Sequence, residues 1–222
     1  MKQTLLATAV AFAGVLAISG AANAALTITI NPAVSNYATD LVAVPDAAVI
    51  WDFDTIFNPL FTYSPPTAVD IGSTPSVARA PKGDPTIYGV VDPTSSPATF
   101  TALKGLKSFS FLVGSPDTFN RMIFYRTNGT VLADRLGSAG LFGSLSPING
   151  KDTAHRINYD FGGEKVGKIE FYSAVNKASF AFEYDRLAGV VPEPASWAMM
   201  ITGFFGLGSV LRASRKRQQV AA

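Results

Sequence analysis

Hydrophobic and polar residues alternate with a period of two along most of the chain between residues 26 and 185. Phe109, Phe111 and Val113 alternate with Ser108 and Ser110, so the three apolar side chains share one face of an extended strand. Similar short stretches, bounded by Gly, Pro, Asn or Ser, predict strands over residues 26–30, 49–53, 86–91, 98–103, 107–113, 121–126, 154–160, 168–172 and 178–185. No long amphipathic helix pattern interrupts them.

Turn signals separate these strands. Asn128-Gly129 is the residue pair that a two-residue hairpin turn favours, and Asn149-Gly150 predicts a second such turn. Residues 31–97 carry most of the prolines, so we expect this part to be rich in loops. Many short strands joined by turns predict an all-β fold, a single antiparallel β-sandwich of jelly-roll type over residues 25–189.

The pattern changes near the C-terminus, where residues 195–211 form a run of 17 residues without a charge. As a helix this run would extend about 25 Å, which suffices for a short membrane span. Trp197 lies at its start, where an aromatic ring suits the membrane interface. Four cations follow it: Arg212, Arg215, Lys216 and Arg217. By the positive-inside bias they predict a cytoplasmic C-terminus.

Pro192-Glu193-Pro194 precedes this apolar run, and Trp-Ala-Met-Met follows after two residues. Prolines exclude a helix interior there, so we expect an exposed, extended segment that a protease can reach. The combination over residues 190–217 resembles the PEP-CTERM sorting signal of Gram-negative bacteria. The resemblance implies that an exosortase processes the protein. The alternative is an ordinary membrane anchor that is never cut.

The N-terminus carries a second targeting pattern. Lys2 precedes an apolar stretch over residues 5–18, and Ala22-Asn23-Ala24 fits a signal peptidase site. Residues 1–24 are therefore expected to be a secretory signal peptide, cut after Ala24 with Ala22 and Ala24 in the protease pocket. An uncleaved N-terminal membrane helix is the alternative.

Removing both signals changes the charge of the chain. The whole chain has a net charge of +2, whereas residues 25–191 hold 13 Lys and Arg against 15 Asp and Glu. A faintly acidic domain gives no electrostatic basis for binding nucleic acid. The chain has no cysteine, which excludes disulfides, thiolate metal sites and thiol nucleophiles.

A second resemblance lies within the sandwich. The segment Gly-Ser-Pro-Asp-Thr-Phe-Asn at 114–120, followed by Met-Ile-Phe-Tyr, is similar to a segment common in exosortase-sorted surface proteins. Phe-Ala-Phe-Glu-Tyr-Asp at 180–185 fits their closing strand, although Arg186 stands where Asn is usual. The family has no assigned catalytic residues that this resemblance could transfer.

Candidate chemistry is sparse. His155 is the one histidine, on a predicted strand, where a surface or half-buried position is the usual outcome, and no hydrolase or phosphate-binding motif occurs. Asp52 with Asp54, and Glu183 with Asp185, are spaced two apart, so each pair shares a strand face. Such pairs could serve a glycosidase, but we expect them to be solvated on an outward face.

The same acids, or Asp117 with Asn120, are candidate oxygen ligands for Ca²⁺; an Asx-type turn is the alternative for the latter pair. No other cofactor or metal is expected, and no catalytic residue is assigned.

These observations predict an exported, non-enzymatic cell-surface or extracellular-matrix protein. It is anchored in the membrane by its tail and then left at the cell surface or outside it. Expected partners are signal peptidase, the exosortase, the membrane and polysaccharide held on an aromatic sheet face. Candidates for that face are Trp51, Tyr63, Tyr88, Tyr125 and Tyr172. The alternative is a secreted glycan-active hydrolase that uses a carboxylate pair.

Overall fold

The computed structural model describes residues 26–64, 69–73, 78–146, 153–173 and 181–191, with Thr202, Phe204 and Phe205. These residues form β1 (Thr27–Asn31), α1 (Tyr37–Ala43), the 3-10 helix η1 (Asp46–Ala48), β2 (Val49–Trp51), β3 (Phe61–Ser64), β4 (Val69–Ile71), β5 (Ile87–Val91), β6 (Ala98–Leu106), β7 (Ser108–Val113), β8 (Arg121–Arg126), β9 (Val131–Leu136), β10 (His155–Asp160), β11 (Val166–Tyr172) and β12 (Phe182–Val190).

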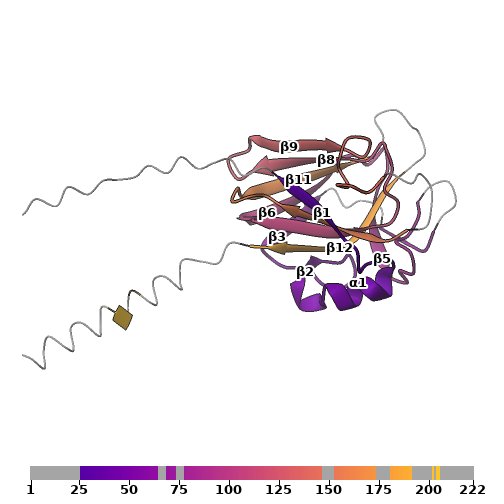
Figure 1. Cartoon of the computed structure of the whole chain (residues 1–222), viewed down its shortest axis with the longest axis horizontal. Helices are drawn as coiled ribbons and strands as arrows, with labels where there is room; N and C mark the ends of the chain where they lie inside the picture. The colour runs from indigo at the N-terminus through magenta and orange to yellow at the C-terminus, as the bar shows by residue number, and fades with distance from the viewer. Residues whose placement is uncertain are drawn as a thin grey trace, which may run out of the picture.

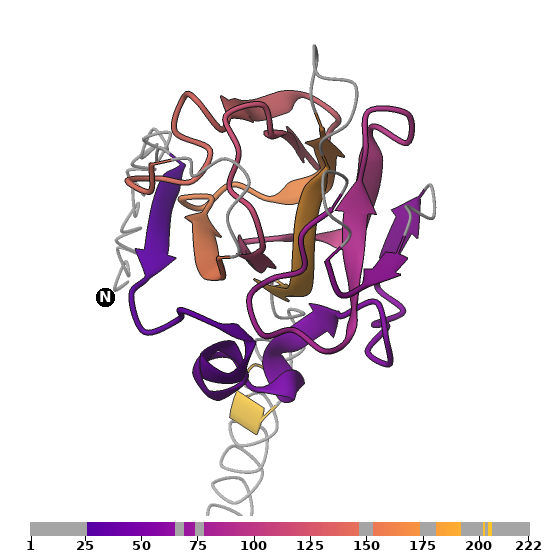
Figure 2. The same cartoon turned by 90° about the vertical axis from the view of Figure 1, so that its right-hand side faces the viewer.

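The strands form two antiparallel sheets that face each other (Figures 1 and 2). Sheet A has the order β1-β10-β7-β12-β5-β4, with β2 also paired to β12, and sheet B has the order β3-β6-β11-β8-β9. The last eight strands therefore contribute β5-β12-β7-β10 to one sheet and β6-β11-β8-β9 to the other. This is the strand order of an eight-stranded jelly roll. The predicted all-β, two-sheet architecture is confirmed.

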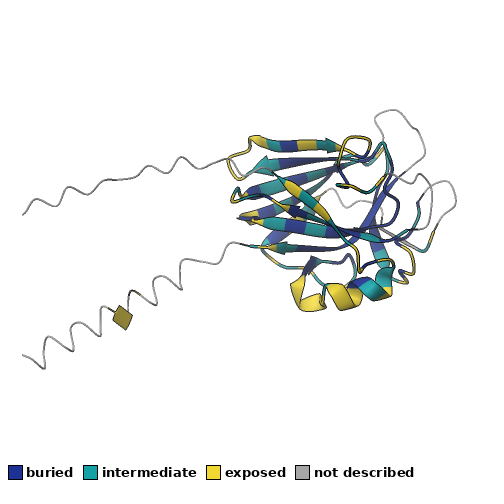
Figure 3. Cartoon of the chain, in the orientation of Figure 1, coloured by how far each residue is buried: buried dark blue, intermediate teal, exposed yellow. Residues whose placement is uncertain are grey.

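An aromatic core fills the space between the sheets, and buried residues recur along the strands of the sandwich (Figure 3). Phe109, Phe111 and Val113 are all buried, as their alternation predicts. The ring of Tyr184 stacks on that of Phe171 with centroids 4.3 Å apart. The phenol group of buried Tyr159 donates a hydrogen bond to the Leu141 carbonyl at 2.8 Å. Twelve of the 25 buried residues of this core are Phe or Tyr, and burial of their apolar area is a main favourable term in folding.

Each predicted strand overlaps an observed one, but the ends differ. β12 continues five residues beyond the predicted end at Asp185, to Val190, one residue past the predicted domain boundary at 189. β2 stops at Trp51, two residues early, and the proline-rich region contains the unpredicted strands β3 and β4.

The helix α1 also lies in this proline-rich region and was not predicted. Asn36 caps it: the Thr39 backbone N–H donates to Asn36 Oδ1 at 2.8 Å, and the Asn36 N–H donates to Thr39 Oγ1 at 3.1 Å. Its burial is the reverse of an ordinary amphipathic helix, because Asp40 is buried while Leu41 and Val42 are exposed. A search for apolar periodicity therefore misses it.

The predicted signal peptide at 1–24 and the Asn149-Gly150 turn lie outside the described residues. So does the predicted membrane helix at 195–211, apart from Thr202, Phe204 and Phe205, which are helical and exposed. Within the part of the chain that the structure describes, no helix is long and apolar enough to span a membrane.

The Asn128-Gly129 turn joins β8 to β9 where predicted, but its length differs. The Gly129 N–H donates to the Arg126 carbonyl at 2.9 Å and the Arg126 N–H to the Thr130 carbonyl at 2.8 Å. Only Gly129 of these residues has a positive φ, of 83°. The connection is therefore a three-residue loop ending in a left-handed residue rather than a two-residue turn.

Replacing Gly129 by Val should destabilise the protein by about 1–3 kcal/mol, because a β-branched residue at this φ is strained. An added Cβ would meet no atom within 4 Å, so the loss would come from the backbone alone. Urea denaturation measures it, and Gly129→Asn, which tolerates a left-handed backbone, is the control. An equal loss in both variants would contradict this account of the turn.

Candidate functional site

Two arginines on the outward side of sheet A share one aspartate of α1. Arg156 of β10 donates to both carboxylate oxygens of Asp40, at 2.8 and 2.5 Å, and Arg186 of β12 donates to Asp40 Oδ2 at 3.0 Å. At most 2% of each of the three residues is exposed. This buried arginine pair therefore fixes α1 on the sheet.

Arg186 also holds the segment that follows α1. Its Nη1 donates to Asp46 Oδ1 at 2.8 Å and its Nη2 to the Val44 carbonyl at 2.5 Å. Arg156 Nη1 in turn donates to the Arg186 carbonyl at 2.7 Å. Residues 43–48 are thereby kept beside the outward face of sheet A.

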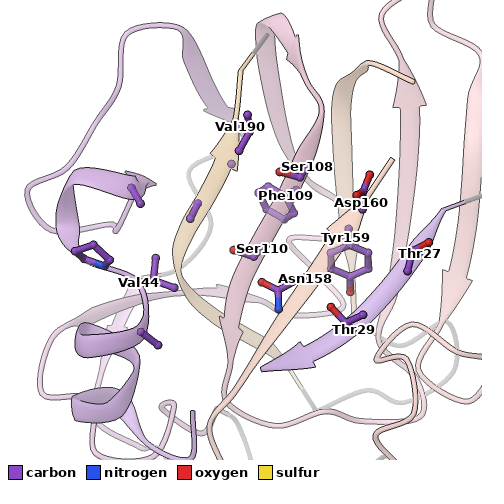
Figure 4. Close-up of a pocket in the computed structure, with 15 residues that line it drawn as sticks. Thr27, Thr29, Val44, Ser108, Phe109, Ser110, Asn158, Tyr159, Asp160 and Val190 are labelled. Carbon is purple, nitrogen blue, oxygen red and sulfur yellow. The ribbon is translucent and has the colours of Figure 1, made fainter. Parts of the chain in front are cut away.

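A groove of about 500 Å³ lies between residues 43–48 and this sheet face (Figure 4). Its floor follows the strand register in two rows. The first row is Thr27, Asp160, Ser108 and Val190, and the second is Thr29, Asn158, Ser110 and Ala188. Six of these eight side chains are polar, and the wall is formed by Ala43, Val44, Pro45 and Ala48.

The period of two explains this floor. Phe109 and Tyr159 alternate with the floor residues and are buried in the core, while Ser108, Ser110 and Asn158 face outward. Hydroxyl, amide and carboxylate groups beside an apolar wall suit a ligand with many hydroxyl groups and an apolar ring face. The volume falls in the range of small-molecule sites.

The residues predicted to direct sorting are not placed by the structure. Pro192, Glu193, Pro194, Trp197, Arg212, Arg215, Lys216 and Arg217 lie outside the described residues, as do Ala22 and Ala24 of the signal peptidase site. The structure therefore bears on the role of the sandwich alone.

Both predicted carboxylate pairs are placed differently from expectation. Asp52 and Asp54 lie in a turn after β2 rather than on a strand, and Asp52 Oδ1 accepts three backbone N–H groups of residues 54–56. Glu183 and Asp185 do share the outward face of β12, but they are 2% and 0% exposed rather than solvated. Burial raises the pKa of both well above the usual range. None of these acids lines the groove.

The other titratable candidates have structural surroundings. Asp117 Oδ2 accepts from the Ser115 hydroxyl at 2.8 Å, and Asn120 Nδ2 donates to the Ser115 carbonyl at 3.0 Å, so these two residues brace a buried loop. His155 is half-buried, as expected, and burial lowers its pKa. Among the described residues, no group of three or more His, Asp or Glu side chains is arranged to hold a metal.

The aromatic candidates do not form one exposed strip. Tyr88 is fully buried, and Tyr63 and Trp51 are half-buried with their ring centroids 6.0 Å apart. Tyr125 and Tyr172 lie on the other side of the molecule, on the outward face of sheet B, and are also half-buried. The predicted aromatic glycan platform is therefore divided into two separate half-buried pairs, Trp51 with Tyr63 and, on sheet B, Tyr125 with Tyr172.

Glu170 accepts hydrogen bonds from the hydroxyl groups of Tyr125 and Tyr172. Its Oε2 accepts from Tyr125 at 2.7 Å and from Tyr172 at 2.8 Å, and its Oε1 accepts from Lys168 at 2.7 Å. Burial disfavours the charged form of Glu170, but these three hydrogen bonds outweigh it and lower its pKa. The pKa of each tyrosine rises to about 12.

Cations also cover these two rings. The ammonium group of Lys168 is 3.8 Å from the ring centroid of Tyr125, and the guanidinium of Arg121 is 5.4 Å from that of Tyr172. The hydroxyl groups and one ring face of each tyrosine are thus already engaged within the sheet. This favours a structural role for the pair over a sugar platform.

The groove was not found in the sequence, although part of its signal is visible there. Ser108 and Ser110 alternate with core residues, and so do Asn158 and Asp160. What the sequence does not show is that these stretches are neighbours, or that residues 43–48 form a wall beside them. Comparison of the chain with models of protein families, with curated proteins and with solved structures gives no match.

Replacing Asp40 by Asn should lower the free energy of unfolding by about 3–5 kcal/mol, because two buried guanidinium groups lose their charged partner. Asp134→Asn is the matched control: its ion pair with Arg121 is exposed and should be worth about 0–1 kcal/mol. Urea denaturation of both variants measures the difference. Equal small losses would mean that Asp40 does not hold α1 in place.

Proposed function

We propose that this is an exported, non-enzymatic protein of the cell surface or extracellular matrix, whose jelly-roll domain contacts polysaccharide. The order of its signals supports export: a signal peptide pattern comes first, the sandwich follows, and an apolar run with Pro-Glu-Pro and a basic end comes last. Signal peptidase would release the N-terminus, and the membrane would hold the C-terminal run until an exosortase cuts near Pro-Glu-Pro.

The groove is the observation that carries the proposed role of the domain. Thr29, Asn158 and Ser110 present polar groups on adjacent strands, beside the apolar wall at 43–48. A polysaccharide offers matching hydroxyl groups and apolar ring faces. The groove lies along the sheet surface and is open to solvent, so it can take part of a polysaccharide chain.

Contact rather than hydrolysis is favoured by the placement of the acids. A glycosidase needs two carboxylates facing each other across its cleft. Asp160 is the one carboxylate among the residues that line the groove, and the pairs Asp52 with Asp54 and Glu183 with Asp185 lie elsewhere. The alternative of a glycan-active hydrolase therefore has less support.

Changing Pro192, Glu193 and Pro194 together to Ala should leave export and membrane insertion intact, because apolar length and flanking cations determine those steps. The protein should then remain uncut and bound to the cell. The mass of the C-terminal fragment in the source bacterium tests this. Deleting residues 212–217 is the comparison and should weaken membrane retention instead. Unchanged maturation of the triple-Ala variant would reduce the tail to a simple anchor.

The double variant Thr29→Val with Asn158→Leu should bind the exopolysaccharide of the producing strain roughly tenfold more weakly, because it loses two hydrogen-bonding groups of about 0.5–1.5 kcal/mol each. Thr29 and Asn158 are register partners on sheet A. Thr62→Val with Thr101→Leu, also register partners but on the outward face of sheet B, is the matched control and should bind normally. Affinity electrophoresis gives both values. Equal binding by the two variants would contradict a role for the groove.

A further inference from the structure

Four aspartates interact in pairs beside the part of sheet A where β12 bulges between Asp185 and Ala188. Asp52 and Asp54 come from the turn after β2, Asp84 from the turn before β5, and Asp185 from β12 itself. The carboxyl groups of Asp84 and Asp185 are in direct contact, Asp52 interacts electrostatically with Asp185, and Asp54 does so with Asp84. We call these four residues the aspartate cluster.

Three members of the cluster have hydrogen bonds that fix their position. Asp52 Oδ1 accepts the N–H groups of residues 54–56, at 2.7–3.1 Å. Asp54 Oδ1 accepts the Ile87 N–H at 3.1 Å, and Asp84 Oδ1 accepts the N–H and the hydroxyl of Thr86, at 2.9 and 2.5 Å. Both oxygens of Asp52 are used, because its Oδ2 accepts the Thr55 hydroxyl at 3.3 Å, whereas Oδ2 of Asp84 has no partner.

Three carboxylate oxygens of the aspartate cluster remain buried without a hydrogen-bond partner among the described residues. They are Asp84 Oδ2 and both oxygens of Asp185. Asp185 is 0% exposed and Asp84 is 7% exposed, so solvent cannot satisfy them freely. A buried polar group without a partner is costly, and a buried carboxylate more so.

Within the part of the chain that the structure describes, no Lys or Arg neutralises the cluster. None of its members forms an ion pair with Lys or Arg among the described residues. Arg186 follows Asp185 in the chain, yet its guanidinium binds Asp40, Asp46 and the Val44 carbonyl instead. Burial first, and then the neighbouring Asp84, raises the pKa of Asp185. The cluster therefore requires either a proton or a cation from outside.

We propose that Asp84 and Asp185 bind Ca²⁺ directly, and that Asp52 and Asp54 add negative charge around it. Ca²⁺ prefers carboxylate and carbonyl oxygens, takes six to eight of them and accepts irregular geometry. Only Asp84 and Asp185 would bind the ion directly, because no group of three or more His, Asp or Glu side chains among the described residues is placed to hold a metal. Water and backbone carbonyls complete the coordination.

A shared proton is the rival explanation, and it satisfies the cluster less well. One proton between Asp84 and Asp185 makes a single hydrogen bond, which involves two of the three unpartnered oxygens. The third would stay unsatisfied, and the charges of Asp52 and Asp54 would remain. A divalent cation satisfies all three oxygens and offsets two negative charges. It would also tie both turns to β12 beside Arg186, which holds the groove wall.

The test is the thermal midpoint of the purified full-length protein in detergent, with millimolar CaCl2 or with EDTA, together with a calorimetric Ca²⁺ titration. Extracellular Ca²⁺ modules have dissociation constants of about 10⁻⁴–10⁻³ M. Saturation to about ten times such a constant should raise the midpoint by roughly 3–6 °C. No shift and no binding heat in the wild-type protein would overturn the proposal.

The variants locate the site. Asp185→Asn keeps the shape of the side chain but removes the charge, so it should lose most of the Ca²⁺ shift, and Asp84→Asn should do the same. Glu183→Gln is the matched control, because Glu183 lies two residues away on the same strand face and also has a buried, unpartnered oxygen. It should keep the full shift. A shift that survives in both Asp variants would place the ion elsewhere. A midpoint that rises in Asp185→Asn at alkaline pH and ignores Ca²⁺ would establish the shared proton instead.

Discussion

The shared carboxylate of Asp40 is the contact on which the outward side of sheet A depends. Two guanidinium groups, from β10 and β12, reach one aspartate of a seven-residue helix, and all three groups are buried. A helix this short is unstable alone, and its apolar residues Leu41 and Val42 face solvent. The buried charges of Asp40, Arg156 and Arg186 therefore hold α1 together with the packing of Tyr37 against Val34, Leu112 and Ala154. The groove wall at 43–48 and the cover over β12 both follow from that attachment.

Arg186 binds Asp40 from a backbone conformation that an arginine rarely adopts. Its φ of 48° is left-handed, where Asn or Gly is favoured over Arg, and such a residue costs of order 1–3 kcal/mol. Arg186 offsets its strain with hydrogen bonds to Asp40, Asp46 and Val44. The bulge turns its side chain under the wall, so the strained backbone and the groove wall have one physical cause.

Alternation of apolar residues was enough to predict the sandwich, because it sets which face of each strand enters the core. Phe109, Phe111 and Val113 are buried for this reason. Alternation also predicts that Glu183 and Asp185 share the outward face of their strand. It does not show that other parts of the chain cover this face. Its cover comes from α1 and from turns in the proline-rich region, where polar caps and buried charges replace apolar periodicity. The groove was not predicted either, because its two rows combine side chains from β1, β7, β10 and β12. Only the pairing of these strands brings the side chains together.

The polar residues on the two outward faces of the sandwich have different surroundings. Those of sheet B bond mainly to one another, whereas those in the groove of sheet A line a surface that is open to a ligand. On sheet B, Glu170 collects Tyr125, Tyr172 and Lys168 into a closed set of hydrogen bonds and cation contacts. Little of that set is left for a ligand. On sheet A, Arg156 and Arg186 are buried with Asp40 under α1, and the groove floor presents short hydroxyl, amide and carboxylate side chains beside an apolar wall. Because the ion pairs of sheet A lie beneath the groove wall, the carboxylate of Asp40 and the guanidinium of Arg186 do not engage the polar side chains of the groove floor. The proposed contact with polysaccharide therefore rests on the groove, and the buried ion pairs of Asp40 hold the groove wall in place.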